Sequence, residues 1–211
     1  MGQRVARDAV TDETFYVSSD MTYLEWKAIQ DGKYGAGTVD LQRKMRYNEL
    51  KDSDQYAAYR ERLGNNAPKS VAAFQKLKYS DDWNEFKAYA RSIESGELSA
   101  LADFELYQNT SKQIDEVLVG KVTSNGLTIT GKSNHTIARV IGSMEQRRNG
   151  VRIDDVLDAL TSGKSEISPI REMKNGRSQK FRNAGVEVSV NPDTGNIIQV
   201  NPIHTKKKEE S

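Results

Sequence analysis

The order of hydrophobic patterns between residues 133 and 202 constrains this chain more than any other feature. Two short segments repeat apolar residues at helical spacing, and the segments after them alternate apolar and polar residues as β-strands do. Turn sequences separate the strand patterns: Asn-Gly at 175–176 and Pro-Asp-Thr-Gly at 192–195. We therefore predict an α+β domain in which two helices pack on an antiparallel sheet of about four strands.

The first helix pattern is expected to begin at a cap formed by Ser133 or Asn134 and to stop at Gly150. The second is expected over about residues 153–160. Strands are expected over residues 166–173, 177–182, 186–191 and 196–201. A hairpin or strand pair that turns at Asn125-Gly126 is expected over residues 121–132. Before this domain (120–211), residues 1–119 are predicted as a mainly helical N-terminal region, with a loose arm over 1–20 and a helix capped by Asp20.

Alternation along the strands assigns side chains to two faces of the sheet. The apolar positions are expected to face the helices: Phe181, Val186, Val188, Val190, Ile198 and Val200. The polar positions are expected on the opposite, open face: Ser178, Lys180, Arg182, Gln199 and Asn201. His135 and Arg139 are neighbours on one side of the first helix, and we expect them at the edge of that open face, across a gap from Lys180.

Composition excludes several kinds of site. The chain has no cysteine, so disulfides, thiolate metal sites and cysteine nucleophiles are excluded, and a net charge of +1 predicts no overall basic surface. Residues 1–20 lack the apolar core of a signal peptide, and no run approaches membrane-spanning length. No HExxH motif or nucleophile elbow occurs. We expect no metal, no cofactor and no membrane span.

The predicted polar constellation contains what metal-free RNA cleavage requires. A general base must take the proton of a ribose 2′-hydroxyl, cations and amide donors must hold the phosphate, and an acid must protonate the departing oxygen. Imidazole titrates near neutral pH and suits either proton-transfer role. The alternative is a structural histidine at a helix start and a solvated strand face. For His204, near the C-terminus, the alternatives are a second acid/base group that reaches the site and a solvated tail residue, and we expect the latter.

Several motifs resemble known families. MTYLEWK at 21–27 and SDQYAAYRERLGNNAPKSVAAFQKLKYSDDWNEFKAYAR at 53–91 resemble the region after the head-morphogenesis domain in phage minor head proteins of the Mu-F-like type. NHTIARVIGS at 134–143, GVRIDDVLDAL at 150–160, NGRSQKF at 175–181 and VNPDTGNIIQVNP at 190–202 resemble toxin domains fused to those proteins. Those domains belong to the barnase/EndoU/colicin/RelE-like (BECR) ribonuclease superfamily.

The resemblance implies an endoribonuclease toxin and points to His135 as the proton-transfer residue, with Arg139 and Lys180 as cations on the phosphate. Gln199 stands where such domains often have threonine, which leaves its role open, and either Arg147 or Arg148 fills the place of a further arginine. We predict catalytic roles for His135, Arg139, Lys180 and Gln199, and substrate contacts for Arg148, Ser178, Arg182 and Asn201.

The resemblance also implies partners and a setting. RNA is the expected substrate, with tRNA among the candidates, and a cognate immunity protein is expected to cover the face of Lys180 and Gln199. Phage head or portal components are further candidate partners. The expected location is a phage particle or, after delivery, the bacterial cytoplasm. Two alternatives stay open: a non-catalytic phage structural protein that binds a partner or nucleic acid, and a nuclease domain that has lost its activity.

Overall fold

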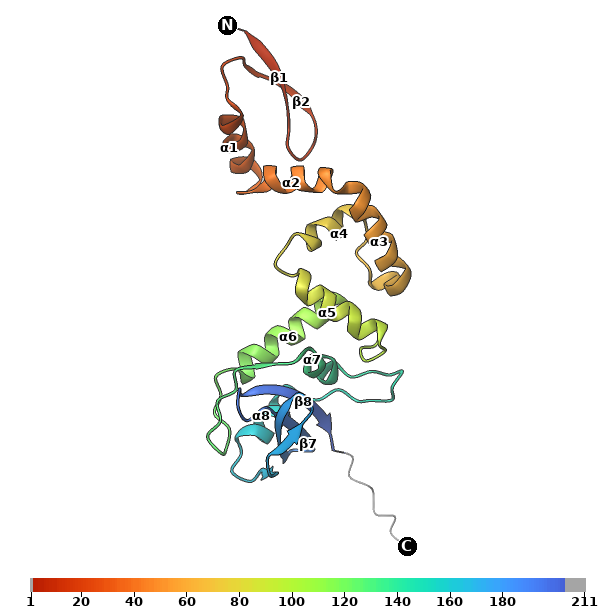
Figure 1. Cartoon of the computed structure of the whole chain (residues 1–211), viewed down its shortest axis with the longest axis vertical. Helices are drawn as coiled ribbons and strands as arrows, with labels where there is room; N and C mark the ends of the chain where they lie inside the picture. The colour runs from red at the N-terminus through yellow and green to blue at the C-terminus, as the bar shows by residue number, and fades with distance from the viewer. Residues whose placement is uncertain (1, 204–211) are drawn as a thin grey trace. The chain divides into compact units, whose positions relative to one another are not determined.

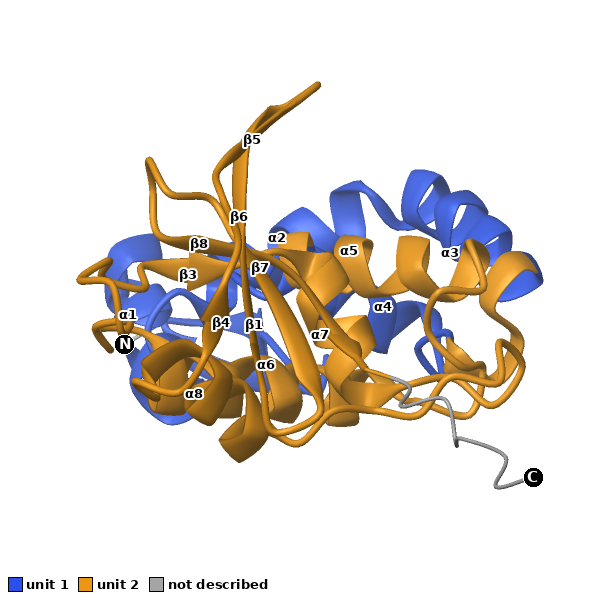
Figure 2. Cartoon of the chain, turned by 90° about the horizontal axis from the view of Figure 1, so that it is seen from below, with its two compact units in different colours: residues 1–61, 67–83 blue, residues 62–66, 84–211 orange. Residues whose placement is uncertain are grey.

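The computed structural model describes residues 2–203, so His204 and the rest of the charged tail lie outside the described residues. The chain divides into two compact units (Figure 2). Unit 1 comprises residues 1–61 and 67–83, and unit 2 comprises residues 62–66 and 84–211. Within residues 2–203, no helix combines the length and the apolar character needed to cross a bilayer.

Unit 1 begins with a β-hairpin rather than the loose arm expected from the sequence. Strand β1 (Gln3–Arg7) pairs antiparallel with β2 (Thr14–Ser18), and helices α1 (Tyr23–Tyr34), α2 (Thr38–Tyr47), most of α3 (Glu49–Leu63) and α4 (Val71–Lys78) follow (Figure 1). The expected cap of α1 was Asp20. The cap is instead Thr22, which forms a reciprocal capping box with Glu25.

A buried carboxylate organises the middle of unit 1. The Asp52 side chain is fully buried and accepts hydrogen bonds from Lys78 Nζ (2.6 Å) and Tyr79 Oη (2.6 Å). These bonds and that of Gln75 lower the pKa of Asp52 despite the opposing effect of burial. The contacts tie α3 to the end of α4, beside an aromatic cluster in which Tyr59 packs on Phe74.

Unit 2 starts well before residue 120, where the sequence placed the domain boundary. It contains η1 (Gly64–Asn66), nearly all of α5 (Trp83–Glu94), α6 (Phe104–Leu118), α7 (Asn134–Ile141) and α8 (Ile153–Thr161). Helix α6 packs on α7, on α8 and on strand β3 (Gly131–Lys132). The segment from residue 84 to 119 therefore belongs to the compact body that carries the sheet.

The sheet of unit 2 has more strands than predicted. Its strands are β3, β4 (Glu166–Ile167), β5 (Arg171–Met173), β6 (Gly176–Asn183), β7 (Val186–Val190) and β8 (Asn196–Pro202). The order is β3-β8-β7-β6-β4, with β5 also paired to β6; β3 runs parallel to β8 and the other pairs are antiparallel. The fold is α+β with a mixed sheet. Within residues 121–132, where a hairpin or strand pair was expected, the structure has an isolated antiparallel bridge between Val122 and Thr128 and the two-residue strand β3.

The helices cover one face of this sheet. Phe181, Val188 and Val200 lie side by side on β6, β7 and β8 and are fully buried. Helix α8 packs on β6 and β7, and α7 packs on β8. The prediction for Ile198 was wrong: a register irregularity after Ser189 turns Ile197 into the core and leaves Ile198 on the open face.

Helix α7 is shorter than the sequence suggested. It ends at Ile141, because Gly142 adopts a left-handed backbone with φ of 84°. Residues 143–148 then form a bridged turn, and Gly150 packs so closely that a Cβ there would lie 2.4 Å from the carbonyl oxygen of Val140. Arg148 consequently lies on a loop folded back against α7 and not on the helix itself.

We predict that Gly195→Ala destabilises the sheet while Gly163→Ala does not. Gly195 has φ of 75°, and an added Cβ would lie 2.0 Å from the carbonyl oxygen of Thr128. The backbone conformation alone costs a non-glycine residue about 1–3 kcal/mol. Gly163 has open space around it and no left-handed backbone. Hydrogen exchange of the β7 and β8 amides measures the loss, and equal protection in the two variants would contradict the prediction.

Candidate functional site

The start of α7 is fixed to the sheet by a confirmed cap. Ser133 Oγ accepts a hydrogen bond from the backbone N–H of Thr136 (3.1 Å) and donates one to the carbonyl oxygen of Ile198 (2.6 Å). The hydroxyl thus caps the helix and joins it to β8. This anchoring determines where His135, the second residue of α7, is held.

The His135 imidazole is contacted at both ring nitrogens. Its Nδ1 contacts Oε1 of Glu97, and its Nε2 accepts a hydrogen bond from Nε of Arg139 at 3.3 Å. A carboxylate at Nδ1 favours the tautomer that carries its proton there, so Nε2 keeps its lone pair. Glu97 lies on the segment between α5 and α6 and was missed by the sequence prediction.

Arg148 completes this group. One of its terminal nitrogens, Nη2, donates a hydrogen bond to the carbonyl oxygen of Glu97. Its Nε and Nη1 are buried and have no hydrogen-bond partner among the residues that the structure describes. Buried N–H groups without acceptors are costly, and a bound anion would satisfy them. We call Glu97, His135, Arg139 and Arg148 the imidazole cluster.

Electrostatics of the imidazole cluster favour a neutral histidine. Burial lowers the pKa of His135, and the positive charges of Arg139 and Arg148 lower it further. The contact with the Glu97 carboxylate stabilises the imidazolium and opposes both effects. With the pKa below the ordinary 6.5, the imidazole is predominantly a free base at neutral pH. A neutral base beside two guanidinium groups suits proton removal from an anionic substrate.

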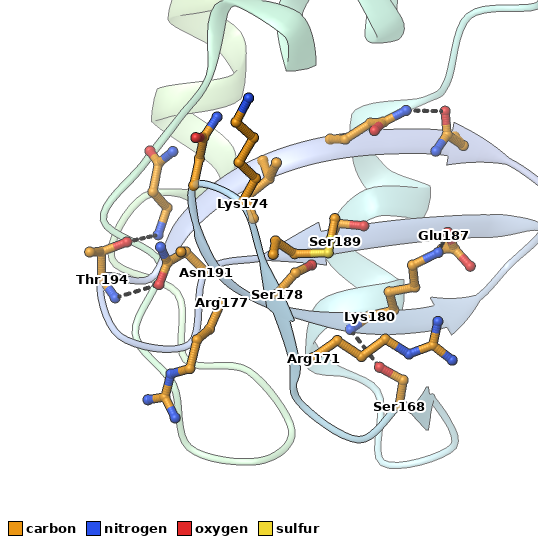
Figure 3. A pocket seen from close by; sticks show the side chains of 17 residues that line it. Ser168, Arg171, Lys174, Arg177, Ser178, Lys180, Glu187, Ser189, Asn191 and Thr194 are labelled. Atoms are coloured by element: carbon orange, nitrogen blue, oxygen red, sulfur yellow. Dashed lines mark hydrogen bonds and ion pairs between the residues drawn. The ribbon is translucent and has the colours of Figure 1, made fainter.

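The other predicted site residues lie on the open face of the sheet. Lys180, Ser189 and Gln199 are register neighbours across β6, β7 and β8 and line a pocket of about 590 Å³ (Figure 3). Ser178 and Asn201, both predicted as substrate contacts, also line it. Gln199 Nε2 donates a hydrogen bond to Oδ1 of Asn201 at 2.9 Å. We call this hollow the sheet pocket.

Glu187 holds the cations of this face in place. Its two carboxylate oxygens accept hydrogen bonds from Nζ of Lys180 and Nε of Arg182, each at 2.6 Å. Burial raises the pKa of Glu187, but these two bonds outweigh it and leave the pKa lowered. Arg182 also donates to Glu166 and does not line the sheet pocket. Glu187 could have been noted from the sequence, since it alternates with the valines of its strand.

The structure does not bring His135 and Lys180 together across one gap, as the sequence analysis expected. His135 and Arg139 belong to α7, which packs on β8 with its apolar residues in the core. Lys180 projects from the face opposite Phe181, and neither His135 nor Arg139 lines the sheet pocket. The eight predicted residues divide into two groups: His135, Arg139 and Arg148 in the imidazole cluster, and Lys180, Gln199, Ser178, Arg182 and Asn201 on the open face.

Over residues 2–203, no group of three or more His, Cys, Asp or Glu side chains is arranged to hold a metal ion. Comparison of this chain with protein-family models, with characterised proteins and with solved structures produced no match.

We predict that Arg148→Gln raises the pKa of His135. Loss of a nearby positive charge makes the imidazolium less unfavourable, so the pKa moves back toward its ordinary value. The chemical shift of the imidazole Cε1 proton, followed by NMR against pH, measures the change. Arg147→Gln removes the same charge from an exposed position of the same loop and is the control. An equal shift in both variants, or none in Arg148→Gln, would contradict the assignment.

Proposed function

We propose that this chain is a metal-independent endoribonuclease whose chemistry takes place at the imidazole cluster. One observation carries the proposal: the His135 imidazole contacts the Glu97 carboxylate at Nδ1 and the Arg139 guanidinium at Nε2, and the charge of Arg148 also acts on the ring. Carboxylate, imidazole and arginine supply orientation, proton transfer and phosphate charge stabilisation respectively. We propose that Arg139 and Arg148 bind the phosphate of the substrate, because Lys180 and Gln199 lie in the sheet pocket and not at the imidazole cluster.

The proposed reaction is an intramolecular transfer within RNA. Nε2 of His135 takes the proton of a ribose 2′-hydroxyl, and the resulting oxygen forms a bond to the adjacent phosphorus. Arg139 and Arg148 stabilise the negative charge that grows on the phosphate oxygens. The bond from phosphorus to the 5′-oxygen breaks, and that oxygen takes a proton from water. The hydroxide that remains takes the proton from the His135 imidazolium, which returns the ring to its neutral form. The products are a 2′,3′-cyclic phosphate and a free 5′-hydroxyl.

Glu97 acts in this proposal as a positioning residue. Its carboxylate fixes the imidazole tautomer and stabilises the imidazolium once the proton has been taken. Glu97 belongs to unit 2 together with His135, so the segment between α5 and α6 contributes directly to the site.

The α+β fold, with α7 and α8 against one face of the sheet, supports a domain of the BECR ribonuclease type. On this proposal the protein is a toxin associated with a phage or prophage, and a cognate immunity protein restrains it. Unit 1, compact by itself, is proposed to serve docking or delivery through phage head components.

We predict that the purified chain degrades RNA in the presence of EDTA and that His135→Ala lowers the rate by about 100-fold or more, the usual contribution of a general base. The measurement is cleavage of total RNA, with the product ends identified as cyclic phosphate and 5′-hydroxyl. Lys112→Ala, on the exposed surface of α6, is the control and should cleave normally. If neither wild type nor variant cleaves, a non-catalytic binding protein becomes the better interpretation.

The pH dependence separates a positioning role for Glu97 from a structural one. Wild-type activity should rise with pH through the lowered pKa of His135, because only the neutral imidazole accepts a proton. Glu97→Gln removes the anion that favours the imidazolium, so the acid limb of the profile should move to still lower pH while the maximal rate falls about tenfold or more. A lower rate with an unmoved acid limb would contradict the positioning role.

A further inference from the structure

We propose that the sheet pocket is a separate binding site for a ribonucleotide, holding its phosphate and its base edge by side chains. The pocket lies on the face of the sheet turned away from the buried valines, and its floor is built from β6, β7 and β8. Because the central strand β7 pairs on both sides, its backbone has no free edge to offer a partner strand. Recognition here must therefore come from side chains, which suits a small polar ligand and not an added β-strand.

Four cationic side chains line the pocket, and two of them are paired with acidic residues. Lys180 is hydrogen-bonded to Glu187, and Arg177 forms a two-point ion pair with Asp193. Arg171 and Lys174 also line the pocket, and within residues 2–203 neither has an acidic partner. These two side chains supply positive charge that the protein does not neutralise. An anionic group is the ligand that complements them.

The position of these cations fits an entering ligand. Arg171 lies on β5 and Lys174 in the turn that joins β5 to β6. Figure 2 shows this hairpin extending beyond the rest of unit 2. In Figure 3, Ser178 and Ser189 lie between Lys174 on one side and Lys180 on the other. Arg171 lies on the Lys180 side of the serines in this view, so a phosphate can meet Lys174 on one side or Arg171 on the other while the rest of the ligand reaches the serines of the floor.

The remaining lining is neutral and rich in hydrogen-bonding groups. The amides and hydroxyls are Asn175, Asn191, Asn196, Gln199, Asn201, Ser168, Ser178, Ser189 and Thr194. Ile198, which is half-buried and placed on this face by the register irregularity, and Met173 add apolar surface. Side-chain amides offer donor and acceptor together, as the edge of a nucleobase requires. A volume of about 590 Å³ lies within the range of small-ligand sites.

These features together point to a nucleotide more than to free phosphate or an acidic peptide. Free phosphate would use the cations but has no planar edge of donors and acceptors to match the side-chain amides. An acidic peptide would supply carboxylates but no planar edge for those amides. The site does not depend on His135, so it holds whether or not the imidazole cluster cleaves RNA.

The test is titration of the full chain with adenosine 3′-monophosphate, uridine 3′-monophosphate, adenosine, uridine and inorganic phosphate, followed by calorimetry and by amide NMR shifts. A mononucleotide has no bond for the proposed ribonuclease to cleave, so binding is read independently of activity. We expect the mononucleotides to shift amides of β6, β7 and β8, and to bind at least tenfold more tightly than either nucleoside or phosphate. His135→Ala should bind them as the wild type does.

The double variant Arg171→Gln/Lys174→Gln should weaken mononucleotide binding by about tenfold or more, since charge-assisted bonds to phosphate are lost. Arg147→Gln/Lys164→Gln removes the same two charges from exposed positions outside the pocket and should bind normally. Three results would overturn the proposal: equal loss in both double variants, phosphate binding as tightly as the mononucleotides, or mononucleotide shifts that avoid β6, β7 and β8.

Discussion

The contact between Glu97 and His135 is the interaction on which the functional account depends. It joins the segment between α5 and α6 to the first turn of α7, and Arg148 reaches the same segment from the loop that follows α7. Three pieces of chain, distant in sequence, thus meet at one imidazole. Burial and two guanidinium groups keep this imidazole neutral, while the carboxylate limits the cost of charging it. A general base requires this balance, because it must be free to accept a proton and stable once it has done so.

The sequence analysis predicted a single site on unit 2, but its polar residues form two separate groups, the imidazole cluster and the sheet pocket. The imidazole cluster has a proton acceptor and cations, and none of its four residues lines the sheet pocket. The sheet pocket has volume and hydrogen-bonding groups, yet no histidine lines it among the described residues. We propose that the imidazole cluster carries out the cleavage and that the sheet pocket binds a nucleotide. Glu187 keeps Lys180 and Arg182 ordered, and this leaves Arg171 and Lys174 to meet an incoming phosphate.

Much of the domain could be predicted from local sequence. The Ser133 cap, helix α8 and the turns at 175–176 and 192–195 follow from short-range rules, and alternation placed Lys180 and Gln199 on one open face correctly. Ile198 was assigned to the wrong face because a bulge depends on the pairing of β7 with β8, which alternation within one strand does not encode. The predicted helix over α7 was too long because Met144 continues the apolar spacing past Ile141. The positive φ of Gly142 ends the helix before Met144 is reached.

Only part of the imidazole cluster could be predicted from the sequence. Arg139 follows His135 by one helical turn, so their contact follows from helical spacing, whereas Glu97 comes from a distant segment that local sequence does not place near them. The most direct test of the account is the protonation pattern of the His135 ring at pH 7, read from long-range proton–nitrogen NMR correlations. The account predicts a neutral ring that carries its proton on Nδ1 and none on Nε2. A proton on Nε2, or a doubly protonated ring at that pH, would contradict it.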